Sequence, residues 1–351
     1  MSRSIVGTMT AAPQLKPPPN SAEDGVSADV EAEGSSLWRY AWPRYWPAWL
    51  FVGWLWLTAQ LPWRLAIAVH LKLGRILARL LRRNRRVVSR NLEICFPELA
   101  PAERDALMRR YFESLGASLA EIAIAWFGSA PRSRPPIRVE GLEHLNAALA
   151  RGKGVILYSG HFTTLDLSPQ CLKPLVPLFA FMYRRRNNPL LDAIQTRGRQ
   201  RTAHVGFANT ASRAMLRMLK QNAAVWYAAD QAYFGKGAEL LPFFGEPAMT
   251  NTATSRLARL SGAAVVPMHF YRLDGGAGYY VRFEEPLAGL PSDDLLEDTR
   301  RLTAVLERFI RECPAQYFWM HRKFKGRGSQ FPDVYARRAA PRAKTESRPT
   351  V

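Results

Sequence analysis

The sequence predicts an α/β fold for the C-terminal part of the chain. From about residue 137, short apolar segments alternate with segments of helical period, which is typical of a sheet flanked by helices. Strands are predicted where β-branched and aromatic residues cluster, at 155–158, 178–183, 225–229, 264–271 and 279–284. Helices are predicted at 143–150, 190–201, 210–221, 251–261 and 294–312. We therefore expect one α/β unit at 137–335.

The N-terminal region predicts a different organisation. Residues 1–36 are rich in Pro, Ala, Ser and Glu, and we expect them to be disordered, as we do the basic tail at 336–351. An uncharged run rich in tryptophan and leucine follows at 46–61. With its flanking aromatic residues it approaches the roughly 17–25 residues of a spanning helix. This predicts a membrane anchor helix within 37–63 that Pro62 breaks or kinks. The alternative is an interfacial helix that enters one leaflet only.

A basic, helical, membrane-proximal segment is predicted at 64–136. Apolar residues recur at helical spacing between 64 and 90, and no acidic residue occurs there. The basic residues of this stretch are Arg64, Lys72, Arg75, Arg79, Arg82, Arg83, Arg85, Arg86 and Arg90. They predict an amphipathic helix lying on anionic lipid at the cytoplasmic side, and a solvated helix face is the alternative. Pro101 opens a further helix, expected to end near Phe127, in which Glu121 either pairs with a buried arginine or lines a pocket.

The composition narrows the classes of partner. The net charge is +20, which favours nucleic acid, an anionic membrane or an acidic protein. No zinc-finger, helix-turn-helix or RNA-binding pattern is present, and the basic residues concentrate beside the hydrophobic run. A membrane surface is therefore the expected partner of that region. The three cysteines are widely spaced and predict a reducing compartment.

A short motif at 154–166 carries the clearest chemical signal. A buried strand is predicted to run into Ser159 and Gly160, which are followed by His161 and, five residues later, Asp166. A histidine at the end of a core strand with a nearby carboxylate is how a general base is oriented. The two side chains meet only if His161 lies on the strand-to-helix turn and Asp166 on the first helical turn, because same-face positions on a helix are three or four apart. The alternative is a turn histidine near a capping aspartate.

Further segments, in a fixed order, resemble a known family. They are 91–99, 159–166, 181–184 with 188–192, 230–231 with 235–237 and 242–245, Pro267 after two valines, and 319–325. In this order, from about residue 45 to 335, the sequence resembles the bacterial lipid A biosynthesis late acyltransferases, whose HxxxxD/E box corresponds to 161–166. It departs from the family pattern in three consecutive arginines, Arg184 to Arg186, and in a closing segment that continues with Gly326.

This resemblance implies a fold and an activity. The fold is a central mixed β-sheet flanked by helices, like that of glycerolipid acyltransferases, with an N-terminal membrane helix. The activity is O-acyl transfer from an acyl carrier protein thioester, without a cofactor, to a hydroxyl of a lipid A precursor. Both partners suit a basic protein, since the carrier is acidic and the precursor carries phosphates or acidic sugars. The expected location is the bacterial inner membrane, single-pass or monotopic, with the core on the cytoplasmic side.

Two alternative functions stay open. One is the same His–Asp chemistry on a lysophospholipid or another glycolipid. The other is a non-catalytic basic membrane-binding relative, against which the presence of both His161 and Asp166 argues.

Roles for individual residues follow from the reaction. His161 is the expected base, and Asp166 would hold its imidazole. By resemblance, Arg184 contacts the oxyanion or an acceptor phosphate, and Arg185 adds phosphate or carrier contacts or belongs to a solvated basic turn. Asp230 is expected to enter the same site, orienting an arginine or binding acceptor hydroxyls, or to form a structural salt bridge. A thioester needs no serine nucleophile, so a covalent role for Ser159 is the lesser alternative.

No metal is expected in the site. Three further histidines, His204, His269 and His321, have no Cys, Asp or Glu at ligand spacing. We expect His321 to pack or to contact a substrate phosphate.

Overall fold

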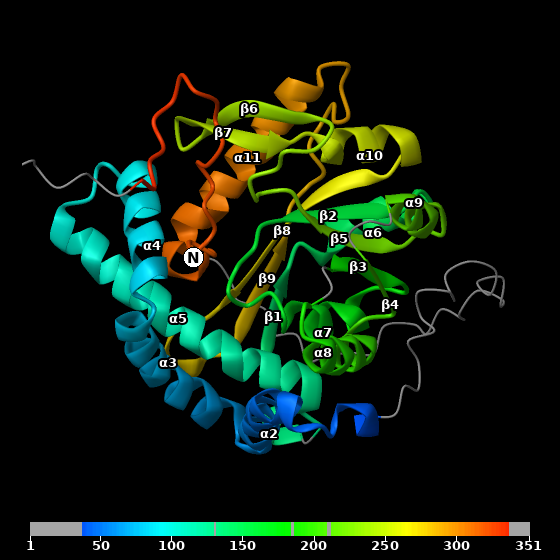
Figure 1. Cartoon of the computed structure of the whole chain (residues 1–351). Coiled ribbons are helices and arrows are strands. Elements are labelled where there is room, and N and C mark those ends of the chain that lie inside the picture. The colour runs from blue at the N-terminus through cyan, green and yellow to red at the C-terminus, as the bar shows by residue number, and fades with distance from the viewer. Residues whose placement is uncertain (1–36, 130, 184–185, 209–211, 337–351) are drawn as a thin grey trace, which may run out of the picture.

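A mixed sheet of seven strands lies at the centre of the computed structural model, with helices on both faces (Figure 1). The structure describes residues 37–129, 131–183, 186–208 and 212–336. The predicted disordered segments therefore lie outside the described residues, except for residue 336. Arg184 and Arg185 also lie outside them.

The elements of the described chain follow one another in the order helices, then alternating strands and helices. The N-terminal helices are η1 (Leu37–Tyr40), η2 (Pro43–Tyr45), α2 (Trp46–Gln60), α3 (Trp63–Leu80), α4 (Arg82–Cys95), α5 (Pro101–Phe127) and η3 (Pro131–Ser133). The strands are β1 (Ile137–Glu140), β2 (Val155–Ser159), β3 (Phe179–Tyr183), β4 (Val205–Ala208), β5 (Ala224–Ala228), β6 (Ala238–Phe243), β7 (Glu246–Asn251), β8 (Ala264–Arg272) and β9 (Tyr279–Phe283). The later helices are α6 (Leu142–Ala150), α7 (Ser168–Leu172), η4 (Lys173–Leu175), α8 (Pro189–Thr202), α9 (Ser212–Lys220), α10 (Ala253–Ser261), η5 (Asp274–Gly276), α11 (Leu295–Glu312) and η6 (Pro314–Gln316).

The sheet has the order β1-β9-β8-β2-β5-β3-β4. All neighbouring strands are parallel except β8 and β9, so β9 and β1 run opposite to the other five. The central mixed sheet flanked by helices is therefore confirmed. The five predicted strands lie within a few residues of β2, β3, β5, β8 and β9, whereas β1, β4 and the antiparallel hairpin β6–β7 were not predicted.

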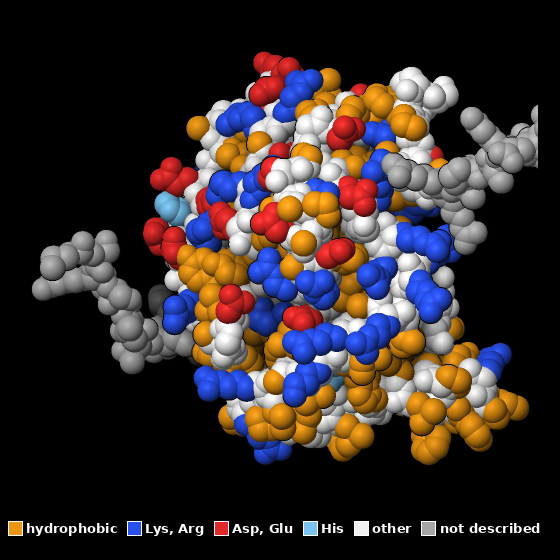
Figure 2. Space-filling view, turned by 90° about the vertical axis from the view of Figure 1, so that its left-hand side faces the viewer, with side chains coloured by type: hydrophobic (Ala, Val, Ile, Leu, Met, Phe, Trp, Pro, Cys, Tyr) orange, Lys and Arg blue, Asp and Glu red, His pale blue; other side chains and the backbone are white. Residues whose placement is uncertain are grey.

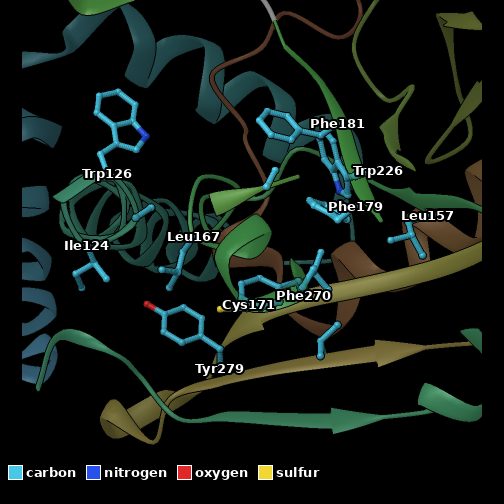
Figure 3. Packing of buried hydrophobic residues seen from close by; sticks show 14 of the residues in the cluster. Ile124, Trp126, Leu157, Leu167, Cys171, Phe179, Phe181, Trp226, Phe270 and Tyr279 are labelled. Carbon is cyan, nitrogen blue, oxygen red and sulfur yellow. The ribbon is translucent and has the colours of Figure 1, made fainter. Parts of the chain in front are cut away.

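The two faces of the sheet bury two separate cores because side chains alternate along each strand. On β2, Val155 and Leu157 belong to the core formed with α5, α7 and α8, while Ile156 and Tyr158 belong to the core formed with α9, α10 and α11. Figure 3 shows part of the first core, where Ile124 of α5 faces Leu167 and the ring of Tyr279 of β9 lies beside Cys171 of α7. Every residue of β2 is buried, which explains its continuous apolar sequence.

The predicted membrane anchor at 37–63 is a pair of 3₁₀ turns and a helix of 15 residues, α2. None of the described helices combines the length and apolar character needed to cross a bilayer. The described helices therefore do not support the predicted N-terminal transmembrane helix. The physical reason lies in the prolines: α2 begins after the turn at Pro43, and the extended backbone of Pro62 separates it from α3, as predicted for that residue.

The basic stretch at 64–90 is two helices rather than one, because the chain leaves helical geometry at Leu81. The predicted amphipathic character is present on α3, where Leu65, Val69, Ile76 and Leu80 are exposed.

The helix α5 joins this N-terminal layer to the sheet. Its bounds are those predicted, and Glu121 is fully buried, as expected for a residue paired with an arginine. One carboxylate oxygen of Glu121 accepts hydrogen bonds from Arg272 of β8 at 2.8 Å and from the hydroxyl of Tyr279 of β9 at 2.6 Å. This buried ion pair fixes α5 against the antiparallel strand pair.

The close approach of α3 and α5 depends on two glycines. A Cβ atom built on Gly116 of α5 would lie 2.6 Å from the Cα of Gly74 of α3. We predict that Gly116→Ala forces the two helices apart and lowers the free energy of unfolding by about 1–3 kcal/mol. Thermal or urea unfolding of the purified protein measures the change.

The matched control is Gly53→Ala on α2, where a built Cβ meets no atom within 4 Å. Since alanine favours helix over glycine, this control should be neutral or stabilising by up to about 1 kcal/mol. Equal stability of Gly116→Ala and the unaltered protein would contradict the close contact.

Candidate active site

The carboxyl ends of β2 and β5 bring two polar side chains together. These parallel strands are neighbours, and their register pairs Ser159 with Ala228. Two residues beyond each strand stand His161 and Asp230, so the same register places them side by side. Gly160 permits this approach, because a Cβ built there would lie 2.5 Å from Leu306 and 3.5 Å from Oδ2 of Asp230.

Asp230 holds His161 by two hydrogen bonds. Its Oδ1 lies 2.6 Å from Nδ1 of the imidazole, and its Oδ2 accepts the backbone N–H of His161 at 2.9 Å. The carboxylate is almost fully buried, whereas about a quarter of the His161 side chain is exposed. Because a carboxylate accepts but does not donate, Nδ1 carries the proton and Nε2 keeps its lone pair. This is the arrangement of an oriented general base.

The pKa values of the pair reflect this contact. Burial lowers the pKa of His161, but the charge and hydrogen bond of Asp230 outweigh burial and raise the pKa above its usual value. Burial raises the pKa of Asp230, yet the interactions with His161 hold it well below the usual range. Asp230 therefore stays ionised, and His161 becomes a free base only above its own raised pKa.

Asp166 does not pair with His161, which corrects the expected pairing. The first helix after β2 begins only at Ser168, so Asp166 lies on the preceding turn and not on a first helical turn. Its Oδ1 lies 3.7 Å from Nη2 of Arg199. Asp166 nevertheless lines the same pocket as His161.

This pocket has a volume of about 440 Å³. Its walls come from the segment after β2, from α7 and α8, and from β3 and β5, and they combine aromatic and polar side chains. They include His161, Asp166, Phe181, Tyr183, Arg186, Gln195, Arg199 and Trp226. Figure 3 shows Phe181 and Trp226 close together on the neighbouring strands. A pocket of this size and mixed character is typical of a small-molecule site.

Arg199 of α8 is the functional candidate that sequence reasoning missed. Its guanidinium stacks over Phe181 at 5.4 Å and Tyr183 at 4.9 Å, and its buried Nη1 has no hydrogen-bond partner among the described residues. Burial lowers its pKa, but a guanidinium stays charged. An unsatisfied cationic N–H on a residue that lines the same pocket as His161 is suited to an anion that forms during reaction. Arginines occupy positions 197, 199 and 201 of the sequence. Only the folded structure shows that, of these three, Arg199 lines the pocket.

The three histidines that were considered as metal ligands, His204, His269 and His321, have structural contacts. His204 accepts the backbone N–H of Phe179, and His321 accepts that of Ala232. His269 is bonded to Glu312 and lies 3.2 Å from the Cys313 sulfur. The described part of the chain contains no group of three or more potential ligands that would hold a metal ion. Ser159 is buried, and among the described residues it forms no hydrogen bond with His161.

A buried lysine, Lys323, acts on the carboxylate of Asp230 through its charge. Lys323 is 4% exposed, and its Nζ lies 3.5 Å from Oγ1 of Thr250. Burial lowers its pKa to about 8. Its positive charge adds to the forces that keep Asp230 ionised.

Comparison with known proteins identifies the family. Residues 35–326 match the family described as bacterial lipid A biosynthesis acyltransferase. The chain belongs to this family. The lipid A biosynthesis lauroyltransferase of Escherichia coli (strain K12) is 37% identical over 294 residues, which cover 84% of this chain and 96% of that protein.

Two further relatives from the same organism are named for other acyl chains. The palmitoleoyltransferase is 35% identical over 286 residues, covering 81% of this chain and 93% of its own length. The myristoyltransferase is 28% identical over 291 residues, covering 81% and 88%. Because these relatives are named for three different acyl chains, membership of the family does not specify chain length.

Replacing Asp230 and replacing Asp166 are predicted to change the pH dependence of the rate in different ways. A protonated imidazole cannot accept a hydroxyl proton, so the rate of acyl transfer should fall as the pH drops through the raised pKa of His161. In Asp230→Asn the carboxylate that raises this pKa is lost while burial remains. We predict that the acid limb of the pH–rate profile moves to lower pH and that the maximal rate falls about 10²–10⁴-fold.

Asp166→Asn is the matched control for this measurement. It also lowers the rate, but its acid limb should stay where the unaltered protein has it, because Asp166 does not contact the ring. An acid limb that moves in Asp166→Asn and stays in Asp230→Asn would assign the partner role to Asp166. Thermal unfolding of both variants verifies that each is folded.

Proposed function

We propose that this protein transfers a fatty acyl chain from the thioester of an acyl carrier protein to a hydroxyl group of a lipid A precursor. The hydroxyl oxygen attacks the thioester carbonyl while its proton passes to Nε2 of His161. The tetrahedral oxyanion then collapses, the C–S bond breaks, and the proton passes from His161 to the departing thiolate. The products are an ester and the free thiol of the carrier, and no cofactor is required.

The His161–Asp230 pair is the observation that supports this proposal most directly. It leaves an unprotonated Nε2 on a partly exposed ring that lines a pocket. A 2.6 Å hydrogen bond orients the ring, and a 2.9 Å hydrogen bond holds the backbone N–H of the same residue. Asp230 also stabilises the imidazolium that forms when the ring takes the hydroxyl proton. The thioester is already activated, so direct attack needs no enzyme nucleophile.

Arg199 is the proposed stabiliser of the oxyanion. Its Nη1 lacks a partner among the described residues, and its position is fixed by two aromatic rings. Its other terminal nitrogen, Nη2, lies 3.7 Å from Oδ1 of Asp166. In this proposal Asp166 positions Arg199 rather than His161. Arg184 stays a predicted contact to the oxyanion or to an acceptor phosphate. Arg185 stays a predicted contact to phosphate or carrier, or part of a solvated basic turn.

The exposed apolar surface of α2 and α3 supports attachment to a membrane. Trp46, Leu50, Trp56 and Leu57 of α2 are more than half exposed, which is unusual for large apolar residues that lie together. Figure 2 shows hydrophobic side chains covering the lower end of the molecule, with Lys and Arg side chains directly above them. We propose that this end lies in the cytoplasmic leaflet of the bacterial inner membrane as a monotopic contact, with the core facing the cytoplasm.

The experiment is an in vitro transfer assay with the full chain in detergent. Lauroyl-, myristoyl- and palmitoyl-carrier protein are offered with a radiolabelled tetra-acylated lipid A precursor. We expect transfer by the unaltered protein and a loss of at least about 10²-fold in His161→Ala, since the general base is removed. The donor that reacts fastest gives the acyl-chain preference.

His144→Ala, on α6 and outside the pocket, is the matched control and should retain full activity. Transfer to a lysophospholipid or another glycolipid, but not to the precursor, would keep the mechanism and replace the acceptor. Transfer that survives His161→Ala, or no transfer to any acceptor, would contradict the proposed function.

A further inference from the structure

A second, larger cleft lies apart from the His161 pocket. It has a volume of about 1560 Å³ and lies between the end of α3, α4, α5 and the C-terminal segment at 332–336. The two cavities share no lining residue. The α3–α4 side of the cleft presents six arginines: Arg79, Arg82, Arg83, Arg85, Arg86 and Arg90. Arg322 adds a seventh from the opposite side, and we call this site the arginine cleft.

Most of this positive charge is not neutralised within the protein. Arg90 pairs with Glu93 at 2.8 Å, and Arg322 lies 3.8 Å from Asp333. No carboxylate of the described residues lies within 4 Å of the other five guanidinium groups. Like charges gathered in one cleft repel one another, so a bound polyanion would stabilise it.

The shape and surroundings of the cleft distinguish it from a flat membrane contact. The exposed residues of α4 include no apolar side chain, whereas α3 exposes Ile76 and Leu80 near its end, just before α4 begins at Arg82. The arginines of α4 therefore begin where the apolar surface ends. Figure 2 shows the same order, a band of Lys and Arg above the hydrophobic end. An amphiphile whose chains lie beside α3 would present its headgroup to this cleft.

The cleft connects to the catalytic pair through two of its walls. Met108 of α5 lines it, and six residues later, about 9 Å along the helix, Ser114 is hydrogen-bonded at 2.7 Å to Thr163, two residues beyond His161. Arg322 follows His321, whose ring accepts the N–H of Ala232, two residues beyond Asp230.

We propose that the arginine cleft binds the phosphate groups of the acceptor headgroup, while the separate pocket at His161 serves the reacting acyl group. This inference rests on the proposed function, which supplies a phosphorylated glycolipid as acceptor. The planar guanidinium group of arginine matches phosphate because it donates two parallel, charge-assisted hydrogen bonds. The cleft thus selects acceptors that carry phosphate on a membrane-resident headgroup.

The test compares the full chain with Arg83→Glu/Arg86→Glu in detergent micelles. The acceptors are a bisphosphorylated tetra-acylated disaccharide and its monophosphorylated derivative. We expect the acceptor KM of the variant to rise about tenfold or more, with donor KM and kcat changed less than about threefold, because only headgroup contacts are lost. The preference for two phosphates over one should disappear. Arg83→Gln/Arg86→Gln should act in the same direction with a smaller change.

Arg213→Glu/Arg217→Glu on the exposed face of α9 is the control, with the same change of net charge. Equilibrium binding of the radiolabelled bisphosphorylated acceptor without donor is the second readout, and it needs no turnover. Absence of transfer with intact binding would defeat the proposed function but not the cleft. A rise in donor KM alone, an equal effect of the α9 variant, or unchanged acceptor binding would each overturn the inference.

Discussion

The hydrogen bonds between parallel strands β2 and β5 determine which side chains meet in the site. Their register pairs Ser159 with Ala228, and the segments that leave them carry His161 and Asp230 two residues further on. A slip of one residue would turn one of these side chains to the other face of the sheet. Burial of the Asp230 carboxylate is costly without partners, and the ring and backbone N–H groups of His161 provide them. The strand pairing and the pairing of His161 with Asp230 therefore stabilise each other.

The helix α5 connects the site to the N-terminal helices. Its Ser114 is hydrogen-bonded to Thr163, two residues beyond His161, and its Glu121 forms the buried pair with Arg272. Removing one partner of such a buried pair is strongly destabilising, because the other charge stays unpaired. On its outer side α5 packs closely against α3 through the glycine contact at Gly116. The apolar surface and the arginine cleft are thus held at fixed positions relative to His161.

Much of the fold could be predicted from the sequence because local patterns determine it. The apolar β2 and the helix opened by Pro101 were predicted from such patterns. The hairpin β6–β7 was missed because its exposed edge mixes polar and apolar residues, including two prolines at paired positions. The N-terminal run has the apolar composition of a spanning helix, but Pro43 and Pro62 limit α2 to 15 residues.

The site was predicted less completely than the fold. His161 was recognised because it lies two residues beyond the end of a buried strand. Its partner was misassigned because spacing within one segment favoured Asp166, whereas Asp230 is 69 residues away and reaches the ring only through strand register. Arg199 was not predicted, because its stacking on Phe181 and Tyr183 depends on how α8 packs over β3. Contacts between elements distant in sequence leave no local pattern to read.

The most direct test of the central claim is ¹⁵N NMR of the histidine side chains in the full chain, titrated with pH. The chain has six histidines, and the spectrum of His161→Gln assigns the resonances of His161. The account predicts that neutral His161 carries its proton on Nδ1, bound to Asp230, and that its pKa lies above the usual value near 6.5. A neutral ring protonated on Nε2, or a pKa below that value, would contradict the proposal that Asp230 prepares His161 as the base.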